Sequence, residues 1–129
     1  MPIRFRYHPD RDLLIHVGEG AVTIEEIEAL RRERREAGVP ASVAHTLTDM
    51  RRAHFAFDPA ALKANEQGRS SDHYGGTRHA ELVDDPHPTA ILLLWKTWLP
   101  AGVVVEVFST VPAAYAWLGV EPRDGDLEF

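Results

Sequence analysis

The sequence predicts a single α/β domain with a five-stranded, mostly parallel sheet, an antiparallel N-terminal hairpin at one edge, and four helices. Three observations support this prediction. A chain of 129 residues, 44% of them hydrophobic, has the size of one domain with one core. After the first strand pair, short apolar runs alternate with segments that carry helix start and stop signals, which is typical of βαβ units. The first two runs are joined by a short turn, which indicates a hairpin.

Composition excludes several classes of protein. The formal net charge of -6 argues against a nucleic-acid partner, because such binding depends on Lys and Arg side chains that neutralise phosphates. The chain has no cysteine, which excludes disulfides, thiolate metal sites and a thiol nucleophile. The longest apolar run is far shorter than the ~20 residues that span a bilayer, and the N-terminus has no apolar leader. We therefore expect a cytoplasmic protein without stable membrane insertion.

The N-terminal third predicts two strands and a helix. Residues 3–7 alternate between apolar and charged side chains, and residues 13–17 are apolar except for His16, so the two runs form the edge hairpin. Thr23 and Glu26 have the spacing of a capping box that begins a helix, and Gly38 marks its end. The arginine-rich second half of this helix alternates with glutamates, and we expect it to be a solvated face.

The central stretch, residues 43–59, is the first place to search for a site. It predicts a buried strand that ends at Asp49, a basic loop with Arg51 and Arg52, and a helix that starts with Asp58 as its cap and runs to about residue 67. Ligands of open α/β sheets bind beyond the carboxyl ends of strands. The two arginines can recognise an anionic group or an acidic partner, or they can simply pair with neighbouring acids to hold the loop.

The C-terminal half predicts two further strands and two helices. Residues 68–78 are polar and glycine-rich, which favours a flexible loop, and residues 80–83 form a short strand. Residues 88–99 suit a strand or a helix, and their length and the preceding proline favour the helix. Residues 103–108 are β-branched nearly throughout and form the last strand. Thr110 caps the final helix, which Gly119 ends.

The remaining residues divide into a domain and a tail. The domain spans residues 1–120, and residues 121–129 form an acidic tail that we expect to be disordered.

The aromatic residues of the chain are the candidates for an apolar binding pocket. Phe55, Phe57, Tyr74, Trp95 and Trp98 can line an apolar pocket, although aromatic residues at helical spacing are more often core. If Trp95 or Trp98 were exposed, a dimer interface would be the better explanation.

Neither a metal centre nor a catalytic site is indicated. One group of side chains has metal-binding chemistry: His73, His79, Asp84, Asp85 and His87. Its spacing matches no helical histidine pair, so we predict no metal and no cofactor. The serines lie in no nucleophile elbow, and we therefore expect the protein not to be an enzyme.

Several segments together resemble a known family. The opening hairpin, the strand that ends TDMRRA, the helix that begins FDPAAL and the closing VEVFSTVPAAYAWLGV resemble small bacterial STAS-like proteins, over residues 3–119. These belong to the superfamily of anti-sigma factor antagonists and are distantly related to CRAL-TRIO lipid-transfer domains. The resemblance implies a five-stranded α/β fold and regulation by protein contacts, with lipid-like ligands as the second possibility.

One departure from that family concerns its switch. Phosphoregulated members carry a serine at the start of the helix that follows the central strand. This chain has Asp58 at the corresponding helix start, so there is no hydroxyl to phosphorylate, and the aspartate already supplies negative charge. Constitutive partner binding remains the expectation.

The sequence thus predicts a non-enzymatic STAS-like binding module that acts through protein contacts as a homodimer, with residues 49–58 as the contact surface. The alternative is a carrier of a small apolar or amphipathic ligand between the helix at 88–99 and the sheet. The predicted binding residues are Asp49, Arg51, Arg52, Phe55, Phe57, Asp58, Tyr74, Trp95 and Trp98.

Overall fold

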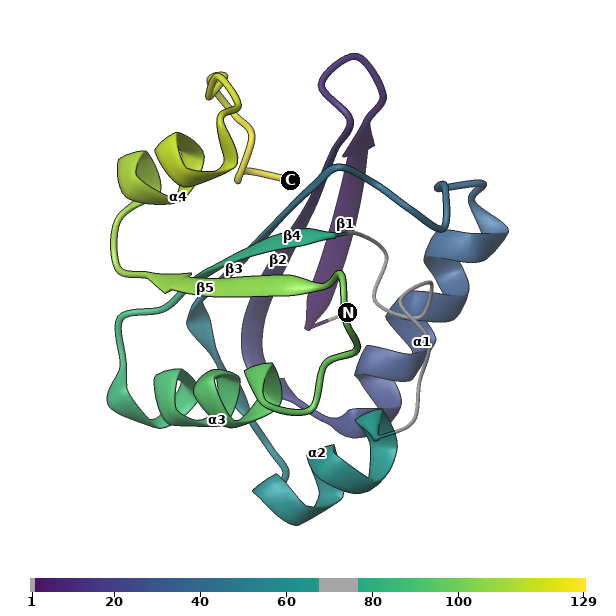
Figure 1. Cartoon of the computed structure of the whole chain (residues 1–129), viewed down its shortest axis with the longest axis vertical. Helices are drawn as coiled ribbons and strands as arrows, with labels where there is room; N and C mark the ends of the chain where they lie inside the picture. Colours follow the sequence, from purple (N-terminus) through teal and green to yellow (C-terminus); the bar gives the residue numbers. More distant parts are fainter. Residues whose placement is uncertain (1, 68–76) are drawn as a thin grey trace.

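The structure is a computed structural model that describes residues 2–67 and 77–129. The chain forms a five-stranded sheet and four helices (Figure 1). In chain order the elements are β1 (Ile3–His8), β2 (Leu13–Val22), α1 (Ile24–Glu36), β3 (His45–Phe55), α2 (Pro59–Glu66), β4 (Arg78–Leu82), α3 (Pro86–Lys96), β5 (Val104–Phe108) and α4 (Val111–Leu118). In the described part of the chain, no helix is long and apolar enough to cross a membrane.

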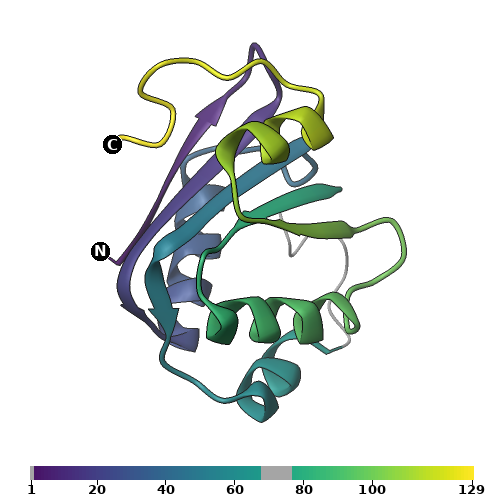
Figure 2. The same cartoon turned by 90° about the vertical axis from the view of Figure 1, so that its left-hand side faces the viewer.

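The sheet confirms the predicted fold class. Its strand order is β1-β2-β3-β4-β5, with β1 antiparallel to β2 and every other neighbouring pair parallel. Helices α1, α2 and α3 lie on one face, and α4 and the C-terminal segment lie on the other (Figure 2). Since successive side chains of a strand point to opposite faces, each strand contributes to two separate cores.

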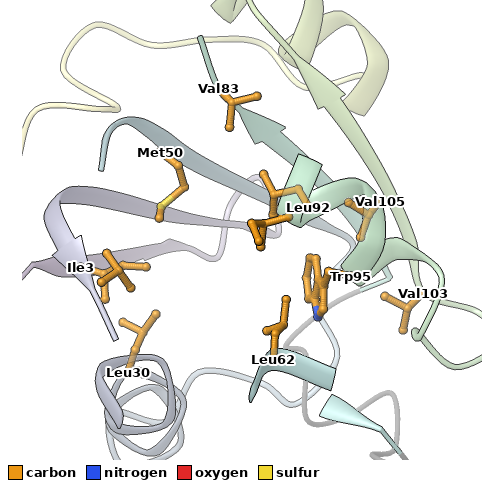
Figure 3. Close-up of a cluster of buried hydrophobic side chains, with 11 residues drawn as sticks. Ile3, Leu30, Met50, Leu62, Val83, Leu92, Trp95, Val103 and Val105 are labelled. Carbon is orange, nitrogen blue, oxygen red and sulfur yellow. The ribbon is translucent and has the colours of Figure 1, made fainter. Parts of the chain in front are cut away.

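The two cores differ in the helices that cover them. On the α1–α3 face, Leu30, Leu62 and Trp95 point toward the strands and toward one another (Figure 3). On the α4 face, Tyr115 and Leu118 pack against a continuous apolar surface of the sheet. Both cores are buried, so the sheet is covered on its two sides as expected for a mostly parallel sheet.

Strands β2 and β3 are longer than the sequence predicted, and this corrects the expected basic loop. Arg51 and Arg52 lie within β3, which continues to Phe55 beside β2. The pairing passes through a register shift between Val17 and Glu19. A Cβ atom at Gly18 would lie 2.7 Å from the sulfur of Met50, so the missing side chain lets the two strands stay close at this irregularity.

The predicted helix caps are confirmed. The side chain of Thr23 accepts a hydrogen bond from the amide of Glu26, and Asp58 accepts one from the amide of Ala61 at 2.8 Å. Thr110 caps α4, and Gly119 ends it in the left-handed conformation with φ 73. Helix α3 begins two residues earlier than predicted and ends three residues earlier. Of the loop predicted at 68–78, residues 68–76 lie outside the described residues, and Arg78 belongs to β4.

The C-terminal segment, which the sequence analysis expected to be disordered, packs against the α4 face. Asp126 is 6% exposed and accepts two hydrogen bonds of 2.8 Å from Arg11, which lies in the β1–β2 turn. Tyr115 of α4 donates a third, at 2.6 Å. The ring of Phe129 lies 4.6 Å from the Arg6 guanidinium on β1. One acidic residue with a buried arginine partner therefore ties this segment across the sheet (Figure 2).

Candidate functional site

A cavity of about 90 Å³ lies between the sheet and helices α1, α2 and α3. Its apolar wall includes Ile3, Leu30, Met50, Leu92 and Trp95. These residues come from β1, α1, β3 and α3, and their side chains converge on one region (Figure 3). The cavity also has polar side chains in its wall, which distinguishes this core from the one under α4.

A row of polar side chains crosses the floor of the cavity. His16 of β2 pairs with Thr48 of β3, which pairs with Glu81 of β4. The register places the three side chains side by side on the α1–α3 face. All three are buried, at 5%, 8% and 4% exposure. Buried polar residues in the middle of a parallel sheet require hydrogen-bond partners or a function.

Hydrogen bonds link Arg34 of α1 to His16, and His16 in turn to Thr48. Arg34 Nη1 lies 2.9 Å from His16 Nε2, and His16 Nδ1 lies 3.1 Å from Thr48 Oγ1. A guanidinium can only donate, so Nε2 accepts and the imidazole proton is on Nδ1, which donates to the threonine. Burial, followed by the nearby Arg34 charge, lowers the pKa of His16 well below its usual value. His16 is therefore neutral.

The second buried arginine of α1 is charge-compensated. Arg31 donates to both carboxylate oxygens of Glu66 in α2, at 2.7 and 3.1 Å. It also donates to Glu28, one turn earlier in α1, at 2.9 Å. This pairing joins α1 to α2 at the side of the cavity and leaves Arg31 without surplus charge.

Glu81 and Arg34 have no such compensation among residues 2–67 and 77–129. Burial raises the pKa of Glu81 to about 8, so its carboxyl group is protonated at neutral pH. The structure shows no hydrogen bond to this carboxyl within those ranges. Arg34 is 7% exposed and has no carboxylate within 4.0 Å in the same ranges. The cavity thus contains a buried cation and a buried neutral acid.

Sequence reasoning missed this polar group, although signals for it exist. The arginine-rich half of α1 was expected to be solvated, whereas Arg31 and Arg34 are buried. Both continue the apolar helical face at four and seven residues beyond Ile27, a spacing that marks the inward side. Thr48 and Glu81 are polar residues within the buried runs of strands β3 and β4. A polar side chain within such a run is the signal that the sequence offers for a polar group on the sheet.

The predicted aromatic residues are found mainly at the cavity. Phe55, Phe57 and Trp95 line it, and the rings of Phe55 and Phe57 lie 5.2 Å apart. Trp98 is partly buried and packs against the same core. Tyr74 lies outside the described residues. The structure therefore brings together three of the five aromatic residues that the sequence singled out.

The predicted charged residues lie elsewhere. Arg51 donates two hydrogen bonds to the Asp49 carboxylate, at 2.9 and 2.8 Å. Burial opposes ionisation of Asp49, but these hydrogen bonds dominate and lower its pKa. Arg52 is exposed and lies 3.6 Å from Glu19, and Asp58 caps α2. These residues form local pairs on the strand and helix start, so they do not converge on one ligand position.

The possible metal ligands also separate. Of the residues that the structure describes, no group of three or more histidine and acidic side chains could hold a metal ion. His79 lies in the cavity wall, and its ring is perpendicular to that of Trp95 with the centroids 6.1 Å apart. Asp85 caps α3 through the amide of His87. His73 falls outside the described residues.

Comparisons with known proteins support the fold. No protein-family model and no curated protein sequence matches the chain. A solved structure of an uncharacterized protein from the DUF3478 family with a SpoIIAA-like fold, from Shewanella loihica PV-4, is similar with a TM-score of 0.60 and 17% identity. The match covers 90% of this chain and 93% of that one.

Two anti-sigma factor antagonists are also similar, each with a TM-score of 0.52 and 14% identity. One is from Mycobacterium paratuberculosis, and the other is SpoIIAA in its unphosphorylated form. The matches cover 91% of this chain and 94% and 97% of theirs. The chain therefore has the SpoIIAA-like, or STAS-like, α/β fold that the sequence predicted.

Proposed function

We propose that this protein is a non-enzymatic binding module that holds a small amphipathic ligand in the cavity between the sheet and helices α1 to α3. The support comes from the wall of that cavity, where apolar side chains surround a buried polar group in which Arg34 has no carboxylate partner and Glu81 no hydrogen bond among the described residues. Ligand sites typically combine a mainly apolar wall with a few oriented polar groups. A cytoplasmic location remains part of this proposal, on the basis of the cysteine-free sequence.

The polar groups suit binding better than acid-base chemistry. Both ring nitrogens of His16 are occupied by Thr48 and Arg34, so this imidazole has no free nitrogen with which to accept a substrate proton. Thr48 lies between the imidazole and Glu81 without the base contact that activates a nucleophile, because His16 donates to its oxygen. A fixed set of donors in such a cavity orients a ligand and does not by itself transform it.

Native mass spectrometry of the purified protein tests this proposal. We expect a stoichiometric small-molecule adduct that is lost on denaturation, and weaker retention in the cavity-filling variant Leu92→Trp. Substitution of exposed Leu93 by Trp in the same helix is the matched control and should keep the adduct. A bare chain whose melting temperature is unchanged by small carboxylates, amides and alcohols would contradict the proposal.

The second candidate is the protein-contact module predicted from the sequence. The names of two similar structures, both anti-sigma factor antagonists, favour it. So does an apolar surface on α3, where Leu93 and Leu94 are 50% and 42% exposed, while Val104 of β5, 47% exposed, points to the opposite face of the sheet. Strand β5 is at the sheet edge. This surface suits a homodimer better than residues 49–58, whose arginines already pair with acids of the same chain.

A further inference from the structure

We propose that the ligand of this cavity is a short-chain carboxylic acid, bound as its carboxylate by Arg34, with Thr48 and Glu81 donating to its oxygens. This inference rests on the proposed function, and it adds the chemical class of the ligand and the orientation of its head group.

The Arg34 guanidinium provides the first step of the argument. One of its five N–H groups is used by His16, and no carboxylate of the described residues lies within 4.0 Å. A buried charge without a counter-ion is costly, and carboxylates are the groups that a guanidinium binds most strongly, often through two parallel hydrogen bonds. Arg34 therefore selects an anion.

The charge of the cavity wall indicates a monoanion. Arg31 and Glu66 cancel one another through their paired hydrogen bonds. His16 is neutral, and Glu81 is protonated at neutral pH because burial raises its pKa to about 8. Of these five groups, Arg34 is the cation that has no carboxylate within 4.0 Å among the described residues, and Glu28, the second acid on Arg31, has a side chain that is 32% exposed to solvent. A carboxylate balances the charge of Arg34, whereas a phosphate monoester, with about two negative charges, would leave buried negative charge in excess.

The remaining polar groups supply donors. Thr48 Oγ1 accepts from His16, so its own hydroxyl proton is free to point toward the cavity. The protonated carboxyl of Glu81 is the neighbouring group on the next strand, about 5 Å away across the sheet. A wall that offers several donors is complementary to a ligand that offers acceptor oxygens, which a carboxylate does.

The apolar wall and the cavity size indicate a short hydrocarbon part. An apolar cavity of about 150 Å³ accepts benzene, and this cavity measures about 90 Å³. A ligand with a few carbon atoms beyond its carboxylate matches that volume. Ile3, Leu92 and Trp95 would contact the hydrocarbon, while the carboxylate lies toward the polar row.

Calorimetric titration with two matched series tests this inference at pH 6.5. The first series contains straight-chain carboxylates from acetate to hexanoate, and the second contains the primary amides of the same lengths. Each amide keeps the size and the acceptor oxygen but removes the negative charge. We expect saturable binding with an optimum at a short chain length, and the best carboxylate should bind at least ten-fold more tightly than its amide.

Substitution of Arg34 tests whether this residue binds the negative charge of the ligand carboxylate. Arg34→Gln should reduce the carboxylate-to-amide preference at least ten-fold, while Arg35→Gln, at an exposed position one residue later in α1, should leave it unchanged. If Arg34→Gln does not fold, Thr48→Val provides the second variant and should lower carboxylate affinity by removing one donor.

The outcomes separate the two proposals. Amides that bind as tightly as carboxylates would overturn the anion assignment while leaving a ligand-binding cavity. An unchanged preference in folded Arg34→Gln would overturn the role of Arg34. Failure of both series to bind, together with a bare chain in native mass spectrometry, would overturn the proposed function itself.

Discussion

The two faces of the sheet differ in whether their buried polar groups have partners within the described part of the chain. On the α4 face the strands are mainly apolar, and the buried acids are paired: Asp126 accepts hydrogen bonds from Arg11 and Tyr115, and Asp49 accepts them from Arg51. On the α1–α3 face the strands carry His16, Thr48 and Glu81 into a cavity, where Glu81 lacks a partner among the described residues. The α4 face is therefore built for stability. We propose that the polar groups of the α1–α3 face lower stability in the free protein and gain partners when a ligand binds.

Loss of the Asp126 contacts should give the largest change in stability. Asp126→Asn leaves Arg11 buried without its counter-ion, and breaking such a pair costs about 3–5 kcal/mol of unfolding free energy. Urea unfolding at pH 7 measures this change in the unfolding free energy. Asp124→Asn, at an exposed position in the same segment, is the control and should change stability by less than about 0.5 kcal/mol. Equal effects would show that the C-terminal segment is not held by this pair.

The ionisation of Asp126 should make the unfolding free energy depend on pH. Burial opposes ionisation, but the hydrogen bonds from Arg11 and Tyr115 dominate and lower the pKa of Asp126 far below its usual value. A lowered pKa in the folded state contributes stability above the unfolded pKa of about 4, and this contribution is lost as the pH falls toward the folded value. The difference between wild type and Asp126→Asn should therefore shrink in acid.

The contribution of Glu81 to stability should depend on pH in the opposite direction from that of Asp126. Its folded pKa of about 8 lies above the unfolded value, so its contribution is fully present below about pH 4 and is lost as the pH rises to about 8. Each pH unit in that window changes the unfolding free energy by up to about 1.4 kcal/mol. Glu81→Gln, which cannot ionise, should exceed wild type in stability at pH 8 by a few kcal/mol.

The comparison of urea midpoints at pH 5 and pH 8 checks this second prediction. The gain from Glu81→Gln should be clearly larger at pH 8 than at pH 5, and Glu128→Gln, at an exposed position, should show no such difference. A gain that is independent of pH would mean that the carboxyl of Glu81 is already ionised in the folded protein.

The apolar surface of α3, which includes Leu93 and Leu94, gives a prediction about assembly. If the protein is a homodimer through this surface, Leu94→Glu should convert it to a monomer, because a charge at this position would be buried at the interface. Light scattering after size-exclusion chromatography measures the mass. Arg52→Glu, on β3, is the control and should remain a dimer. A wild-type monomer at high concentration would contradict the homodimer.

The smallest effect is expected on β3. Arg52 has a side chain that is 65% exposed and lies 3.6 Å from Glu19, a geometry that contributes little in water. Arg52→Ala should change the unfolding free energy by less than about 0.5 kcal/mol, with no effect on ligand binding in the cavity. A clear loss of partner or ligand binding would restore residues 49–58 as the site predicted from the sequence.

The fold could be predicted because its signals are local. The caps at Thr23, Asp58 and Thr110 depend on hydrogen bonds within three residues. The long β2–β3 pairing and the Arg11–Asp126 contact depend on residues far apart in the chain. Sequence periodicity does not report such contacts. The sequence therefore predicted a basic loop where β3 continues beside β2, and a disordered tail where Asp126 binds Arg11.

The candidate site could be predicted only in part for the same reason. Aromatic residues indicated an apolar pocket, and Phe55, Phe57 and Trp95 do line the cavity. Its polar groups come from α1, β2, β3 and β4, and a charged residue on an amphipathic helix usually faces solvent. The inward direction of Arg34 depends on the packing of α1 against His16 of β2, a contact between residues far apart in the chain.

A structure of the protein determined with the best-binding short-chain carboxylate tests the central claim most directly. The account predicts electron density for the ligand between the sheet and α1–α3, with its carboxylate oxygens within hydrogen-bond distance of Arg34 and of Thr48. A carboxylate bound at exposed arginines such as Arg52, with none beside Arg34, would contradict it.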